Sequence, residues 1–126
     1  LGLKAEYAFQ NPESINGPFG TLSLNLSEQG NSQQACGMVK ISTLWGLGTT
    51  TNLFFIGSSN FNPSTGYTTI RTEGQGIMTT IPDKATYVKA EITITIYPGL
   101  KEGELSVEGF FTNFQIKATS IQYMNA

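Results

Sequence analysis

Histidine is absent from this 126-residue sequence, and cysteine occurs once, at Cys36. The missing histidine excludes Ser-His-Asp and Cys-His nucleophile systems, together with every histidine-ligated metal site. A single cysteine forms neither an internal disulfide nor a thiolate zinc site. We therefore expect Cys36 to be a small apolar packing residue rather than a reactive thiol.

Charged side chains are also scarce, at 13% of the residues, and the net charge is −2. The seven basic residues are scattered, which argues against nucleic-acid binding and against a polybasic membrane patch. No apolar run approaches the roughly 20 residues that a membrane span needs, so we expect no membrane insertion. Ser, Thr, Asn and Gln make up one third of the chain. The surface is therefore expected to be neutral and polar.

Phosphate-binding and dinucleotide-binding glycine motifs are missing as well. The glycines at Gly46 and Gly48, and at Gly74 and Gly76, form GxG pairs that extend no further. Such pairs predict turns or bulges between strands. We expect one of them to separate a strand at residues 67–72 from another at residues 77–81.

Apolar and polar residues alternate through nearly the whole chain, the pattern of β-strands with one buried face. In residues 87–97 the even positions from Val88 to Ile96 are apolar, which predicts that this face lies inside. Residues 53–56 are continuously apolar, as in a strand covered on both faces or lying at a subunit contact. Near Thr119 and Ser120 the apolar parity switches, which predicts a β-bulge.

Eight or nine short strands without an amphipathic helix predict an all-β, antiparallel fold. For this number of strands a two-sheet sandwich with jelly-roll topology is preferred, and an immunoglobulin-like sandwich is the second choice. Residues 1–126 are expected to form a single domain. The chain begins without Met and ends just after an apolar alternation, so we expect it to be the C-terminal domain of a longer chain.

Carboxylates are the remaining groups with catalytic potential. Glu91 and Glu108 could meet across neighbouring strands, as a glycosidase requires. Lys89 and Lys101 offer them simple surface ion pairs, so we predict solvated carboxylates and no enzymatic activity. Glu102 and Glu104 lack the Asp-rich spacing of a dedicated calcium loop, and a calcium ion there is left open. No cofactor is expected.

The longest irregular stretch is residues 57–66, which we predict to be a loop. Its aromatic residue, Phe61, is flanked by Asn60 and Asn62, and the stretch carries no charge. An aromatic ring among amides can stack on a sugar and hydrogen-bond its hydroxyls, so these three residues are the candidate ligand-binding site. The alternative is an ordinary loop whose Phe61 packs back onto the sandwich.

Neutral strand faces rich in threonine suit packing against identical neighbours. Tyrosine is enriched and charge is depleted in such interfaces, and burying part of a low-charge surface improves solubility. The candidate oligomer-interface residues are Tyr87, Tyr97 and Phe54. Trp45 is expected to be a core or interface anchor.

The closing segment from Gly109 to Lys117, GFFTNFQIK, forms an aromatic-rich final hairpin in this interpretation. It resembles the end of TNF-like and C1q-like jelly-roll heads, and among these the head of a bacteriophage spike. The resemblance implies a homotrimer on a virion or cell exterior that binds a host-surface receptor or glycan without catalysis. The alternative is a monomeric carbohydrate-binding module of a secreted protein.

Overall fold

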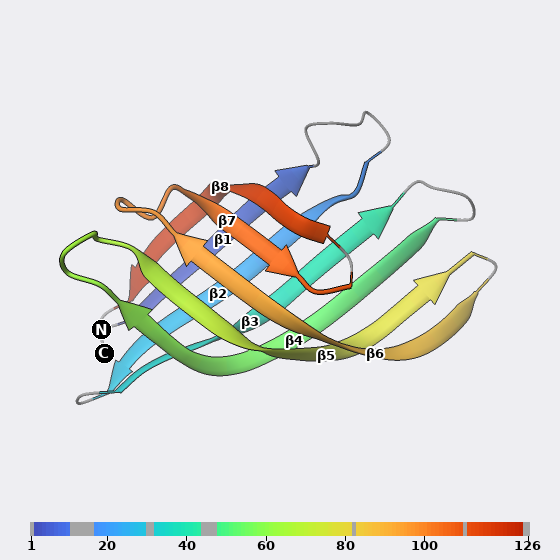
Figure 1. Ribbon diagram of the computed structural model, residues 1–126, viewed down its shortest axis with the longest axis horizontal. Helices are drawn as coiled ribbons and strands as arrows, with labels where there is room; N and C mark the ends of the chain where they lie inside the picture. Colours follow the sequence, from blue (N-terminus) through green and yellow to red (C-terminus); the bar gives the residue numbers. More distant parts are fainter. Residues whose placement is uncertain are drawn as a thin grey trace.

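The computed structural model describes residues 2–10, 17–29, 32–43, 48–81, 83–109 and 111–124. These residues form eight antiparallel strands in one sheet that closes into a barrel (Figure 1). Each strand pairs with its neighbour in sequence, and β8 closes the barrel on β1. The strands are β1 (Gly2–Gln10), β2 (Phe19–Gln29), β3 (Ser32–Thr43), β4 (Thr49–Phe61), β5 (Thr68–Thr80), β6 (Lys84–Ile96), β7 (Glu102–Val107) and β8 (Phe111–Met124).

The all-β, antiparallel class predicted from the sequence is confirmed. The two-sheet sandwich and its jelly-roll topology are not confirmed, because the strands follow one another around a single sheet (Figure 1). Alternation of apolar and polar residues is the same in both architectures, since each strand buries one face in either case. A jelly roll places strands that are not consecutive in sequence side by side, whereas here each strand pairs with the next one in the chain and β8 closes on β1.

The core is the interior of the barrel. Ile92, Ile94 and Ile96 on β6 are fully buried, as the alternation in that strand predicts. Eight strands leave an interior that side chains just fill or that holds one small ligand. The largest fully buried side chains are Tyr7, Phe114, Leu22, Leu24, Ile41, Leu53, Ile70, Ile92, Ile94, Ile96, Leu105 and Ile116.

The predicted bulge in the last strand is confirmed. Tyr7 pairs with Ala118 and Glu6 pairs with Ser120, so Thr119 is the extra residue. The Thr119 hydroxyl donates a hydrogen bond of 3.2 Å to the Glu6 carbonyl oxygen. The extra residue changes the parity of β8, which keeps Ile121 against the core after the bulge.

The prediction that residues 73–76 separate two strands is wrong, because β5 runs unbroken through them. A Cβ on Gly76 would lie 1.6 Å from the Asn52 carbonyl oxygen, and one on Gly74 would lie 2.3 Å from a methyl group of Ile92. These glycines therefore allow close approach of β4 and of a core side chain, which a sequence pattern does not distinguish from a turn.

Residues 57–61, predicted to begin a loop, instead continue β4. Ser59, Asn60 and Phe61 pair with Ile70, Thr69 and Thr68 of β5. The turn itself is shorter and begins at Asn62, whose backbone carbonyl accepts a hydrogen bond of 2.7 Å from the Gly66 N–H. Small polar residues are tolerated in this strand because its outer face is exposed.

Two further features bear on the sequence predictions. Trp45, expected to be an anchor, and Gly46 lie outside the described residues. The described part of the chain contains no helix able to span a membrane.

Candidate functional site: the mouth of the barrel

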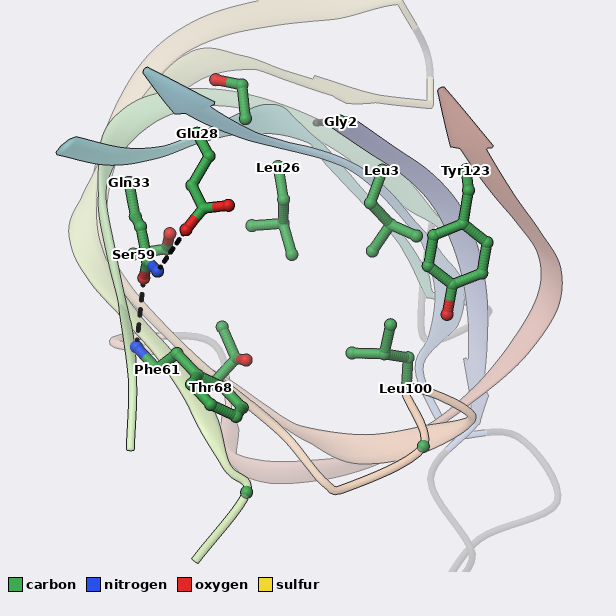
Figure 2. A pocket seen from close by; sticks show the side chains of 13 residues that line it. Gly2, Leu3, Leu26, Glu28, Gln33, Ser59, Phe61, Thr68, Leu100 and Tyr123 are labelled. Carbon is green, nitrogen blue, oxygen red and sulfur yellow. Dashed lines mark hydrogen bonds between the residues drawn. The ribbon is translucent and has the colours of Figure 1, made fainter. Parts of the chain in front are cut away.

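Inward-facing residues at one end of the barrel surround an open cavity. This is the end at which Gly2 on β1 pairs with Met124 on β8. Alternation along β2 and β4 turns Glu28 and Phe61 to the same side as the core residues of those strands. Figure 2 shows these side chains arranged around the mouth together with Leu3 and Leu26.

The cavity has a volume of about 460 Å³, within the range of small-molecule sites. Its wall is mainly apolar. Glu28, Gln33 and Ser59 lie on one side of the mouth, and Tyr123 lies on the other (Figure 2). The lining residues are Gly2, Leu3, Leu26, Ser27, Glu28, Gln33, Ser59, Phe61, Gly66, Thr68, Gly99, Leu100 and Tyr123.

The polar side of the mouth is held together by Gln33 on β3. Its amide nitrogen donates to Glu28 Oε1 at 3.3 Å, and its amide oxygen accepts the Phe61 N–H at 3.3 Å (Figure 2). This chain of hydrogen bonds connects β2, β3 and β4. It holds the Glu28 carboxylate at the rim of the cavity.

The opposite side of the mouth depends on Tyr7. Its hydroxyl donates a hydrogen bond of 2.7 Å to the carbonyl oxygen of Leu100, a residue that lines the cavity. Burial raises the pKa of Tyr7 to about 12, and the nearby Tyr123 acts in the same direction. The phenol therefore stays neutral and remains a donor through the physiological range.

Leu100 occupies the left-handed region of backbone space, with φ at 64°. A branched residue seldom adopts this conformation without compensation from its surroundings. The turn between β6 and β7 supplies it, since the Leu100 N–H donates to the Tyr97 carbonyl oxygen at 3.0 Å and Tyr7 holds the Leu100 carbonyl. Leu100 is thereby placed over the cavity rather than in solvent.

The three residues predicted to bind a ligand do not share one surface. Phe61 lines the cavity and is 48% exposed. Asn60, its neighbour in β4, is on the opposite face of the strand, and Asn62 belongs to the turn, where its side-chain oxygen accepts the Ser64 N–H at 2.9 Å. Phe61 is thus the member of this set that the fold places at a cavity.

Of the predicted interface residues, the structure brings two together. Phe54 pairs with Gln75 on the outer face, and the Tyr87 hydroxyl donates to Gln75 Oε1 at 2.7 Å. Tyr97 lies ten positions from Tyr87 in the sequence, about 30 Å along an extended strand. Its ring contacts Tyr67, with centroids 5.4 Å apart.

The continuously apolar run at residues 53–56 is not covered on both faces within one chain. Leu53 and Phe55 point into the core, whereas Phe54 and Ile56 are 62% and 75% exposed. Cys36 pairs with Ile56 and is itself exposed, so its expected role as a core filler is wrong. Its outward position follows from strand parity, because Ala35 takes the buried position beside it.

The carboxylates considered for catalysis lie on the outer surface. Glu91 forms an ion pair of 3.0 Å with Arg71, and the Glu108 N–H donates to the Glu91 backbone carbonyl oxygen at 2.9 Å. Neither residue lines the cavity at the mouth. The ion-pair partner of Glu91 is thus an arginine on β5 rather than one of the lysines expected.

Glu104 is occupied by hydrogen bonds from Gln115, Tyr97 and Asn113, which hold the pKa of its carboxyl below the usual range. Glu102 is exposed, and its register partner in the neighbouring strand β8 is Lys117. Within the described ranges, no three acidic or cysteine side chains meet in a way that could hold a metal ion.

No family model, curated protein or solved structure matches this chain. The cavity and the outer face are therefore the features from which a function is inferred.

Several residues of the mouth were not singled out from the sequence. Glu28 and Gln33 lie on the consecutive strands β2 and β3, Tyr123 lies on β8, and Leu100 lies in the turn between β6 and β7. The sequence signal for Glu28 was present, because it follows Leu22, Leu24 and Leu26 at the same parity. The alternation of residues does not show that β2 and β4 end at the same mouth of the barrel.

Proposed function

We propose that this protein is a non-catalytic binding protein that holds a small, mainly apolar molecule in the mouth of its barrel. The cavity of about 460 Å³ between Leu3, Leu26, Phe61 and Leu100 carries the proposal. Such a volume suits a ligand of modest size, whose apolar body would replace water against the leucine side chains. The polar groups at the rim would orient the exposed end of the ligand.

A neutral, environment-sensitive fluorophore such as N-phenyl-1-naphthylamine tests this function. Fluorescence enhancement is expected with the wild-type protein. Ser59→Trp, which places an indole in the cavity, should abolish the enhancement. Ser58→Trp is the matched control, because Ser58 is the neighbouring exposed residue on the outer face of β4. Equal enhancement in both variants, or none in the wild type, would contradict binding at the mouth.

A second proposal is supported by the outer face of β3 to β6. It retains the function expected from the sequence, a trimeric receptor- or glycan-binding head on a virion or cell exterior. Phe54, Ile56 and Tyr87 are 62%, 75% and 56% exposed, and none of them carries a charge. Exposed apolar side chains gathered on one sheet face are typical of contacts between protein chains. The occupant proposed for this face is a second copy of the chain.

The mass of the protein in solution tests the second proposal. A trimer is expected by light scattering, and Phe54→Ser combined with Ile56→Ser should return the 13.6 kDa monomer. The control is Phe61→Ser, because Phe61 lies at the mouth rather than on this face. A monomeric wild type would contradict the trimeric head and would leave the alternative of a monomeric carbohydrate-binding module, which a glycan array tests directly.

A further inference from the structure

The described residues that line the cavity include an acidic side chain but no basic one, which bears on the charge of its ligand. Among the described residues that line it, Glu28 is the one with a charged side chain. The seven lysines and arginines of the sequence all lie in the described part of the chain, and none lines the cavity. An anionic head group would therefore meet a carboxylate at the rim and no cation.

The position of the Glu28 side chain is set by its strand and by a hydrogen bond. It continues the inward-facing series of β2, and the Gln33 side chain donates to its Oε1 atom. The two ion pairs within the described residues join Arg71 to Glu91 and Lys89 to Glu73, so neither uses Glu28. Its carboxylate is thus turned toward the mouth without a basic side chain beside it (Figure 2).

Two aromatic rings complete the rim. Phe61 and Tyr123 line the cavity and are 48% and 73% exposed, and Figure 2 places them on different sides of the opening. The faces of aromatic rings attract cations, and do so for quaternary ammonium groups in particular. The carboxylate at the rim and the aromatic rings of the opening both favour a positively charged ligand over a negatively charged one.

We propose that the ligand is a cationic amphiphile, with an ammonium head group at Glu28 and an apolar body between Leu3, Leu26 and Leu100. This proposal depends on the proposed function, since it names the chemical class that the same cavity selects. The carboxylate selects for positive charge, and the leucine side chains select for an alkyl or ring body. Fatty acids and other anionic amphiphiles are disfavoured by the same arrangement.

Displacement of bound N-phenyl-1-naphthylamine tests the selectivity. Decyltrimethylammonium and decyl sulfate share an alkyl chain and differ in the sign of the head group, and each is used below its micelle concentration. The cation should displace the fluorophore at a concentration about three- to fivefold lower than the anion, as expected for a solvent-accessible charge pair. Added salt should reduce the difference.

Variants assign the selectivity to one carboxylate. Glu28→Gln keeps the shape of the side chain and should remove the preference, and Glu28→Lys should reverse it. Glu6→Gln is the matched control, since it removes the same charge from an exposed residue on β1 and should leave the preference unchanged. Circular dichroism of each variant establishes that the barrel is intact.

The outcomes distinguish failure of the proposed binding function from failure of the proposed cationic ligand. Failure of the neutral fluorophore to bind the wild-type protein would overturn the binding function itself. Binding of the fluorophore with equal displacement by the cation and the anion would overturn only the assignment of a cationic ligand. A preference that persists in Glu28→Gln would also overturn it, because another group would then select the charge.

Discussion

The hydroxyl of Tyr7 on β1 donates a hydrogen bond of 2.7 Å to the backbone carbonyl oxygen of Leu100 in the turn between β6 and β7. The two residues are 93 positions apart in the chain. This contact links the first strand to a turn between two strands with which it does not pair. It also fixes the carbonyl of a residue with a left-handed backbone, so the position of Leu100 at the cavity depends on a group that does not itself line it.

Removing the hydroxyl of Tyr7 should weaken the fold. Tyr7→Phe leaves the Leu100 carbonyl without this donor, and we expect the free energy of unfolding to fall by about 1–2 kcal/mol. Urea denaturation measures the change. Tyr87→Phe is the control, because it removes a hydrogen bond of the same length, 2.7 Å, from an exposed side chain and should cost less than about 0.5 kcal/mol. Equal losses in the two variants would refute the importance assigned to the buried bond.

The same tyrosine predicts a loss of stability at high pH. Burial raises its pKa in the folded protein from 10.0 to about 12, so folding favours the neutral phenol. The stabilisation is therefore complete below about pH 10 and is lost as the pH rises toward about 12. The difference in unfolding free energy between the wild type and Tyr7→Phe, measured along this range, should shrink. A constant difference would show that Tyr7 does not titrate with a raised pKa.

Truncating the buried face of β6 should be costly. Ile94 is fully buried, and Ile94→Ala should lower the free energy of unfolding by about 2–5 kcal/mol through lost burial and the cavity left behind. Thr93→Ala changes the adjacent residue on the outer face and should stay within about 0.5 kcal/mol. Guanidinium denaturation of both variants provides the comparison. A loss below half a kcal/mol for Ile94→Ala would mean that this strand faces the other way.

A methyl group at Gly76 should disturb the pairing of β4 with β5. Its Cβ would lie 1.6 Å from the Asn52 carbonyl oxygen, so the backbone must shift, and we expect Gly76→Ala to cost at least about 1–3 kcal/mol. Gly2→Ala is the control, since the nearest atom to its Cβ is 3.6 Å away. Thermal unfolding of the two variants distinguishes the sites. If Gly76→Ala melts at the wild-type temperature, the close approach of the strands is not as described.

Local pattern alone was sufficient for much of the fold. The alternation that ends at Ile96 predicted a buried face, and the parity switch at Thr119 predicted a bulge that the register of β1 and β8 contains. Both follow from the two-residue period of a strand, because adjacent side chains point to opposite faces whatever the strand pairs with. The absence of histidine likewise excluded whole classes of chemistry without any structure.

Pairing between distant strands decided the rest. Closure of β1 on β8 joins residues more than a hundred positions apart, and nothing in the alternation of either strand specifies it. Gly74 and Gly76 looked like a turn because glycine is common where chains bend, whereas here it admits a neighbouring backbone and a core side chain. Glu28 and Phe61 meet at one mouth because β2 and β4 end on the same side of a closed barrel. The sequence determined which face of each strand is buried, because that depends on the strand's own residues. The tertiary structure determined which buried faces share one cavity, because that depends on how all the strands pair.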